Sequence, residues 1–241
     1  MMQKQRRIVD KLAAAVEQIN LREALAVRNI RIFFSKRDRA KYISHLDMTR
    51  LFQRAVRRSG ITMWYTEGFH PHLYMTFALP LSLGIESDCE SVDMRLLDEI
   101  SLEGVKELLN AVLPVGVKVT DVRDVGMKAN VIASSNYSVK VLSLSKKKEE
   151  MIAFLSRDEI LMTKKGKAGE KTVNVKPWIY DFEVSENGRD LDLTLRLASG
   201  NTNTLNPQML LSVFANEYNV SVDGAFILRT EIFAENGEIF R

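Results

Sequence analysis

The stretch RNIRIFFSKRDRAKYISHLDMTRLFQRAVRRSG, residues 28–60, decides the fold class of this chain. Residues 28–35 are rich in isoleucine and phenylalanine, which favour a β-strand. In residues 44–59 the apolar side chains recur at intervals of three and four, the spacing of one face of an α-helix. Ser44 suits the N-cap of this helix, and Gly60 suits the residue that ends it. The stretch therefore predicts a strand followed by an amphipathic helix.

The sequence that follows extends this pair into the order β-α-β-β-α-β, which is typical of a ferredoxin-like unit. Strands are expected at residues 62–65, 73–78, 91–97 and 115–124, with a helix at residues 102–112. The second part repeats the order, with strands at residues 134–144, 159–164, 178–185, 190–198 and 225–234 and helices at residues 146–156 and 207–218. We therefore expect an α+β protein of two tandem ferredoxin-like (βαββαβ) sandwiches, residues 28–124 and 134–241. An extra N-terminal helix is expected within residues 1–27.

Composition limits the possible function classes. With 241 residues, 46% of them hydrophobic and 27% charged, the chain is typical of a globular protein with two small domains. The longest weakly polar run, residues 74–85, contains Pro80 and is too short to cross a membrane. The N-terminus is polar, so we expect a cytoplasmic protein with no membrane contact. The sequence contains neither a P-loop nor a dinucleotide fingerprint.

The single cysteine, Cys89, restricts the chemistry further. No CxxC pair exists, which excludes a zinc ribbon, and one thiol cannot hold an iron–sulfur cluster. The acidic neighbours Asp88 and Glu90 should raise the pKa of this thiol, so we interpret it as structural. We expect the chain to bind no cofactor and no metal of its own.

The net charge of +3 hides a strong asymmetry. Residues 28–60 contain 10 basic and 2 acidic residues, whereas residues 86–107 contain 8 acidic and 2 basic residues. A basic ridge is expected on the first helix, formed by Arg50, Arg54, Arg57 and Arg58. Further basic residues precede it, namely Arg31, Lys36, Arg37, Arg39 and Lys41. Arginine suits phosphate recognition, so we interpret the ridge as an RNA-binding surface, although a solvated face or internal neutralisation by residues 86–107 would also explain it. A second basic segment, residues 163–176, suggests a hairpin tip.

The three histidines lie within residues 45–72. His45 opens the first helix, and His72 belongs to the unusual loop TEGFHPH, residues 66–72. If this loop packs over the start of the helix, His45 and His72 would converge, with Glu67 as a neighbouring carboxylate. These three residues are the catalytic candidates, and Phe69 is a candidate for stacking on a base. Their spacing matches no metal-ligand motif.

Several short sequence motifs resemble those of the radical SAM-linked protein family of bacteria. They are RIFFSK (residues 31–36), ISHLD (43–47), RAVRR (54–58), YTEGFHPH (65–72), FALPLSLG (77–84) and ESDCE (86–90). The resemblance covers residues 28–234 and implies a cobalamin-binding radical SAM protein as the partner. The family pattern in the loop is GFNPHP, so His70 and Leu73 depart from it here, which leaves His72 as the better candidate. The chain lacks the cluster cysteines, so any radical chemistry would belong to the partner.

Three functions remain open at this point. The leading hypothesis is an accessory binding module that recognises RNA or another anionic substrate for a radical SAM enzyme. The alternatives are a metal-independent RNA-acting enzyme with a histidine as general acid or base, and a structural subunit whose basic face docks on an acidic protein.

Overall fold

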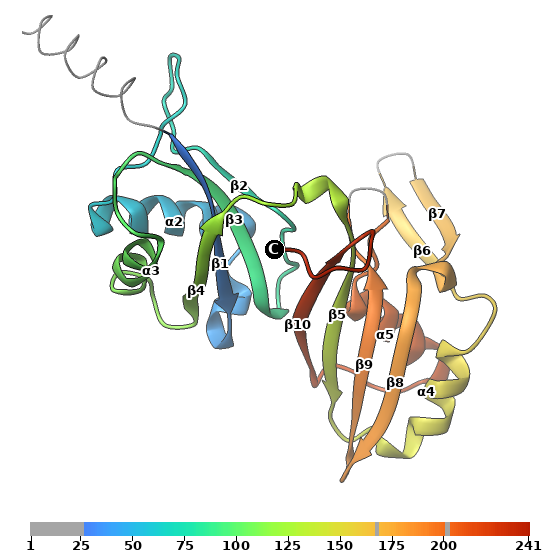
Figure 1. Cartoon of the computed structure of the whole chain (residues 1–241). Coiled ribbons are helices and arrows are strands. Elements are labelled where there is room, and N and C mark those ends of the chain that lie inside the picture. Colours follow the sequence, from blue (N-terminus) through green and yellow to red (C-terminus); the bar gives the residue numbers. More distant parts are fainter. Residues whose placement is uncertain (1–26, 167–168, 201–202) are drawn as a thin grey trace, which may run out of the picture.

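The computed structural model describes residues 27–166, 169–200 and 203–241, and it confirms the α+β class (Figure 1). The strands are β1 (Arg28–Lys36), β2 (Met75–Phe77), β3 (Glu86–Leu96), β4 (Val117–Asp124), β5 (Ile132–Val141), β6 (Leu161–Gly166), β7 (Gly169–Asn174), β8 (Ile179–Asn187), β9 (Asp190–Ala198) and β10 (Ala225–Ala234). The α-helices are α2 (His45–Ser59), α3 (Leu102–Asn110), α4 (Lys148–Leu155) and α5 (Pro207–Tyr218). Short 3-10 turns are η1 (Asp38–Tyr42), η2 (Ala129–Val131), η3 (Ser145–Lys147) and η4 (Lys176–Trp178). The helix expected within residues 1–27 lies almost wholly outside the described residues.

One large mixed sheet runs through the molecule, with the strand order β4-β1-β3-β10-β5-β9-β8 and with β2 paired to β3. We call residues 27–124 the N-terminal half and residues 132–241 the C-terminal half. The two halves join where β3 and β10 run parallel, through the pairs Leu228–Glu86 and Arg229–Ser87. The other pairings in this sheet are antiparallel. The two halves therefore share a sheet, and their division into two tandem ferredoxin-like sandwiches stays a prediction.

Helix α2 forms where the sequence predicted it. The Ser44 side chain accepts a hydrogen bond from the Asp47 amide at 3.1 Å, and Gly60 ends the helix with a φ of 76°. The apolar face of α2 packs on the inward side chains of β1, and the Phe34 and Phe52 rings lie 4.9 Å apart in an edge-to-face contact. This packing holds the opposite face of α2 toward solvent.

The C-terminal half follows the predicted pattern closely. The observed bounds of β9, α5 and β10 are those expected from the sequence. Asn187 and Asp190 pair across the β8–β9 turn, where Gly188 adopts a φ of 65°. Helices α4 and α5 share a core in which the Phe154 and Phe214 rings lie 5.4 Å apart.

Two expected strands differ from the structure. The strand predicted at residues 62–65 is wrong, because that segment forms isolated bridges such as Met63–Leu96. Strand β2 begins at Met75, which pairs with Met94 on β3. Residues 62–65 and β2 therefore share one edge of β3, and neither forms a long ladder of paired residues. The strand expected near residues 159–164 is β6, which pairs with β7 in a separate two-stranded sheet. Side chains at the tip of this basic hairpin lie outside the described residues.

The end of the chain returns to the junction between the halves (Figure 1). Phe240 is buried with Ile132 and Ile232, and its ring lies 4.3 Å from the guanidinium carbon of Arg31 on β1. The Met127 amide donates to the carbonyl of Arg241 at 3.4 Å. Residues of both halves therefore line the same junction. Among the described residues, no helix is long and apolar enough to cross a membrane.

Candidate functional site

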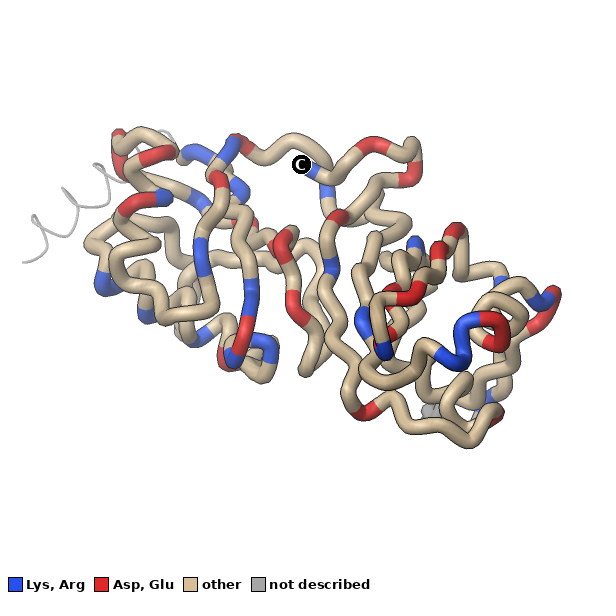
Figure 2. Tube along the Cα trace, turned by 90° about the horizontal axis from the view of Figure 1, so that it is seen from below, with Lys and Arg blue, Asp and Glu red and all other residues tan. Residues whose placement is uncertain are grey.

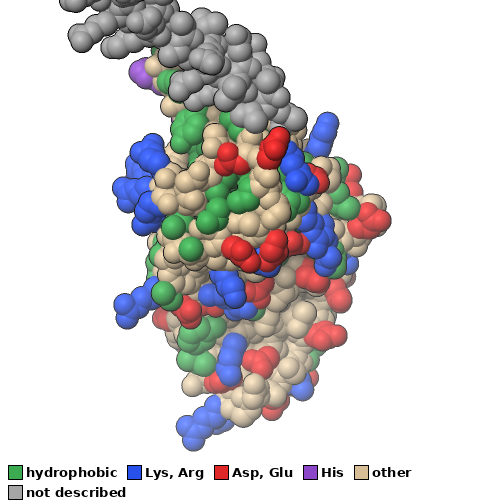
Figure 3. Space-filling model, turned by 60° about the vertical axis from the view of Figure 1, so that its left-hand side comes forward, with side chains coloured by type: hydrophobic (Ala, Val, Ile, Leu, Met, Phe, Trp, Pro, Cys, Tyr) green, Lys and Arg blue, Asp and Glu red, His purple; other side chains and the backbone are tan. Residues whose placement is uncertain are grey.

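The arginine ridge of α2 consists of Arg50, Arg54, Arg57 and Arg58, and all four residues are exposed. Arg50 forms an ion pair with Asp47 at 2.9 Å, and Arg58 donates to the carbonyl of Val112 at 3.1 Å. Across the described parts of the chain, the side chains of Arg54 and Arg57 have neither a hydrogen bond nor an ion pair, although the charge of Arg54 helps to lower the pKa of Asp47. Seen from the side of the N-terminal half, one group of basic side chains lies at the left edge of the surface, and others are spread over the rest of this face (Figure 3).

The helix α2, which carries the ridge, is stabilised at its start by Asp47. The ion pair with Arg50 and the hydrogen bond from the Ser44 hydroxyl lower the pKa of Asp47, the hydroxyl having the larger effect. Asp47 therefore stays ionised at the positive end of the helix, where a carboxylate is stabilising. Because the other face of α2 is buried, Arg54 and Arg57 are displayed on a well-anchored element.

Of the basic residues before α2, Arg31 and Lys36 do not extend the exposed ridge, contrary to the sequence-based expectation, whereas Arg39 is exposed. Arg31 is fully buried and makes a bidentate pair with Asp93 at 2.7 and 2.8 Å. Lys36 is buried as well. The exposed footprint is therefore smaller than the sequence suggested.

The acidic stretch supplies partners for two further cations of this group. The Arg37 guanidinium pairs with Asp88 at 2.7 Å and with Glu86 at 3.3 Å, and Lys41 lies 3.6 Å from Glu86. Figure 2 shows basic and acidic positions interspersed over both halves. The acidic stretch thus neutralises cations near β1 and η1, whereas Arg54 and Arg57 remain unpaired among the described residues.

The loop of residues 66–72 projects from the N-terminal half as a narrow hairpin (Figure 1). The Nδ1 atom of His72 lies 2.9 Å from the Thr66 hydroxyl and 3.2 Å from the carbonyl of His70. Glu67 is exposed, and the Phe69 side chain is 100% exposed. The contacts of His72 are thus local to the loop, and Phe69 is free to meet a partner.

His45 lies elsewhere. Its ring contacts Phe77 edge-to-face at 5.0 Å, beside a small cavity that Lys36 and Glu90 also line. Figure 1 shows the loop projecting outward from the N-terminal half, and the printed contacts of His45 and His72 do not bring the two rings together. The pairing of residues 65 and 73 closes the loop on itself as a hairpin.

A buried charged cluster, formed by Lys36, Glu90 and Arg229, connects the two halves. Glu90 on β3 forms an ion pair with Arg229 on β10, and the Arg229 guanidinium also donates to the carbonyl of Leu79 at 2.8 Å. The Lys36 ammonium donates to the carbonyl of Ile43 at 2.8 Å. Burial is the main cause that lowers the pKa of Lys36, and Arg229 adds to it against the opposing effect of Glu90. Burial also disfavours the charged form of Arg229, but Glu90, together with Tyr137 and Cys89, outweighs this effect, and the pKa of Arg229 is raised.

Sequence reasoning missed this cluster, although a signal existed. The inward side chains of β1 alternate at Ile30, Ile32 and Phe34, and the next position in that period of two is Lys36. A lysine at an inward position predicts a buried cation that needs an acidic partner. The partner from β3 and the second cation from β10 depend on long-range pairing, which the pattern does not reveal.

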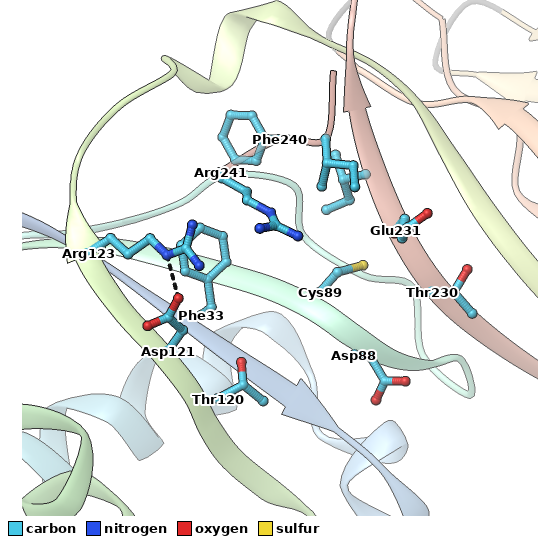
Figure 4. A pocket seen from close by; sticks show the side chains of 12 residues that line it. Phe33, Asp88, Cys89, Thr120, Asp121, Arg123, Thr230, Glu231, Phe240 and Arg241 are labelled. Atoms are coloured by element: carbon cyan, nitrogen blue, oxygen red, sulfur yellow. Dashed lines mark hydrogen bonds and ion pairs between the residues drawn. The ribbon is translucent and has the colours of Figure 1, made fainter. Parts of the chain in front are cut away.

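A groove of about 230 Å³ lies at the junction of the halves (Figure 4). Its walls come from β1, β3, β4, β10 and the end of the chain, and include Phe33, Cys89, Arg123, Glu231 and Arg241. Phe33 alternates with the inward residues of β1, so the groove opens on the face of the sheet turned away from α2.

Cys89 lies at this groove, and the pKa of its thiol is raised. Its sulfur lies 3.7 Å from the carbonyl of Arg229, and burial raises the pKa of the thiol to about 11. The predicted direction is correct, but burial contributes more than the acidic neighbours do. Within the described ranges, no group of three or more His, Cys, Asp or Glu residues could hold a metal ion.

The comparisons with known proteins identify a family and two distantly similar structures. Residues 29–207 match the family described as "Uncharacterized protein conserved in bacteria (DUF2344)". No curated protein matches the sequence. A chain in the crystal structure of a Cbf5-Nop10-Gar1 complex is 12% identical, with a TM-score of 0.46, and the match covers 86% of this chain and 50% of that chain. The crystal structure of an unknown protein from Galdieria sulphuraria is 10% identical, with a TM-score of 0.25, covering 85% of this chain and 99% of that chain. Similarity at this level carries no argument about the fold or the activity of this chain.

Proposed function

This chain belongs to a family of uncharacterised proteins conserved in bacteria, and we propose that it is an accessory module that binds RNA, or another anionic substrate, for a radical SAM partner enzyme. The observation that carries the proposal is the exposed pair Arg54 and Arg57 on the anchored helix α2. Guanidinium groups match phosphate oxygens in charge and geometry. Because the Arg54 and Arg57 side chains have no ion-pair partner in the part of the chain that the structure describes, their guanidinium groups remain available to bind phosphate. The resemblance of these short sequence motifs to the radical SAM-linked family supports a radical SAM enzyme as the partner.

Two finer features belong to the same proposal. The strand orders β4-β1-β3-β2 and β10-β5-β9-β8 in the two halves support a division into two ferredoxin-like units. The single cysteine supports action in a reducing compartment such as the cytoplasm.

The histidine-dependent enzyme is the less favoured candidate. General acid–base catalysis needs groups within reach of one reacting centre. His45 and His72 lie in separate surroundings, and the hydrogen bonds of His72 are made within its own loop. Turnover of RNA by the purified chain, lost in His72→Ala, would favour this alternative over the binding module.

The salt dependence of RNA binding tests the proposed function. The dissociation constant of the full chain for single-stranded RNA is measured over a series of salt concentrations. We expect Arg54→Ala/Arg57→Ala to weaken binding and to reduce the slope of log K against log salt by about 1.4, since each phosphate contact on a single strand contributes about 0.7. Over a rise from about 50 to 200 mM salt, this means the wild type loses about sevenfold more affinity than the variant.

The matched control is Arg189→Ala/Lys146→Ala, which removes two exposed cations from the C-terminal half. This control changes the net charge by the same amount as the ridge variant. If the ridge is the RNA-binding surface, the slope of log K against log salt for the control should stay near that of the wild type. Equal slopes for all three proteins, or no RNA binding by the wild type, would contradict the proposal. Capture of an acidic protein through the ridge, without RNA binding, would instead support the structural-subunit alternative.

A further inference from the structure

The groove at the junction is a small open cavity to which both halves contribute side chains. Its volume of about 230 Å³ is below the roughly 300–1,000 Å³ typical of sites for drug-sized ligands. Both halves contribute to its walls, β1, β3 and β4 from one side and β10 with the end of the chain from the other. A site of this size suits one small flat group rather than a helix or a folded domain.

An aromatic ring forms part of the wall. Phe33 is half-buried, and in Figure 4 its ring points toward the cavity. The guanidinium carbon of Arg123 lies 6.0 Å from the centre of that ring, and Asp121 holds the Arg123 side chain by an ion pair. A ring with an arginine held beside it offers stacking and cation–π contact to a flat aromatic ligand.

Charged groups at the groove remain available. The Arg241 guanidinium points toward the cavity in Figure 4, and neither Arg241 nor Glu231 has a side-chain hydrogen bond or ion pair within the described part of the chain. By contrast, Asp121 is paired with Arg123, and Asp88 is paired with Arg37. The groove thus presents a free cation for an anionic group and a free carboxylate for hydrogen-bond donors.

We propose that this groove binds one nucleotide of single-stranded RNA, with the base stacked on Phe33 and a phosphate bound by Arg241. The Glu231 carboxylate is an acceptor for ribose hydroxyls or base amino groups. A flat base, an anionic phosphate and donor groups occur together in a nucleotide, which matches the ring, the guanidinium and the carboxylate. The inference rests on the proposed RNA-binding function but uses a surface separate from the ridge.

Duplex RNA does not fit the same description. Its bases are stacked inside the helix, whereas bases of single-stranded RNA can be splayed out onto aromatic side chains. The groove therefore distinguishes the two forms, while the ridge, which meets phosphates, is expected to bind both.

The test is the affinity of Phe33→Leu for fluorescein-labelled single-stranded RNA and for duplex RNA of the same length, measured by anisotropy on the full chain. We expect single-stranded binding to weaken roughly 5- to 150-fold, the range for losing one base–aromatic stack. The salt slope should stay unchanged, because stacking releases no counterions, and duplex binding should change little. The matched control is Phe226→Leu, which removes a ring that is 54% exposed outside the groove and should leave both affinities unchanged.

A second variant protects the test against misfolding. Arg241→Ala removes an exposed side chain at the end of the sequence, and we expect weaker single-stranded binding with a smaller salt slope. Normal single-stranded binding by both Phe33→Leu and Arg241→Ala, while the ridge variant loses affinity, would overturn the groove and leave the proposed function standing. Equal losses for single-stranded and duplex RNA in Phe33→Leu would also overturn it. No RNA binding by the wild type would overturn both proposals.

Discussion

Glu90→Gln tests whether the buried charged cluster stabilises the junction. The Glu90 and Arg229 side chains are 6% and 2% exposed, so solvent screens their ion pair very little. Glutamine keeps the shape of the side chain but removes its charge. Arg229 would then keep the neutral carbonyl of Leu79, and Lys36 would lose the attraction of the carboxylate. Removing one partner of a buried pair costs about 3–5 kcal/mol, because an uncompensated charge stays buried.

The free energy of unfolding, obtained from urea denaturation followed by circular dichroism, measures this loss. A small protein has about 5–15 kcal/mol of stability in total, so the expected loss is a large share of it. The control is Asp124→Asn, which breaks the exposed pair with Arg28 and should change stability far less. A further variant, Glu90→Leu/Arg229→Met, should be more stable than Glu90→Gln, since it leaves one uncompensated cation in the cluster, Lys36, whereas Glu90→Gln leaves two. The reasoning is refuted if Glu90→Gln costs no more than Asp124→Asn.

Three further predictions concern packing, backbone conformation and the thiol. Phe52→Ala should lower the free energy of unfolding by about 3–5 kcal/mol in the same assay, because Phe52 is fully buried against Phe34, whereas Phe69→Ala should leave it unchanged. Gly116→Ala should destabilise the protein by about 1–3 kcal/mol, since Gly116 has a φ of 89° and an added Cβ would lie 2.7 Å from the Arg37 carbonyl oxygen; a melting temperature equal to that of the wild type would contradict this. Burial raises the pKa of the Cys89 thiol from 9.0 to about 11, which reduces the reactive thiolate about a hundredfold, so alkylation at about pH 8 should be much slower in the folded protein than in urea. Equal alkylation rates in the two conditions would show that the thiol is not protected.

Local patterns predicted much of this fold because they report local physics. The N-cap at Ser44 and the apolar spacing after it define α2, and the Asn187-Gly188 turn defines the β8–β9 hairpin. The failed strand at residues 62–65 shows the limit of such patterns. Its alternation is real, since Met63 is buried, but whether a segment becomes a strand depends on how much of the edge of β3 is left for it.

The candidate sites divide in the same way. The ridge follows from helical spacing alone, so the sequence placed Arg50, Arg54, Arg57 and Arg58 correctly on an exposed face. Arg31 could not be placed correctly, because the ring that covers it, Phe240, comes from the other end of the chain. The groove depends on the same return of the chain and on the parallel pairing of β3 with β10, neither of which has a local signal.

The positions of the ridge and the groove restrict how any RNA could use both. Helix α2 covers the face of β1 formed by Ile30, Ile32 and Phe34, and the ridge lies on the far side of that helix. Phe33 points to the opposite face of the same strand. A helix alone is about 10 Å across, so the two surfaces are separated by a helix layer and a sheet. If both surfaces bind RNA, a short segment can occupy only one of them, and a longer chain must pass around an edge of the sheet to reach the other. The groove would then select a single unstacked nucleotide, while the ridge holds a distant part of the same molecule through its phosphates.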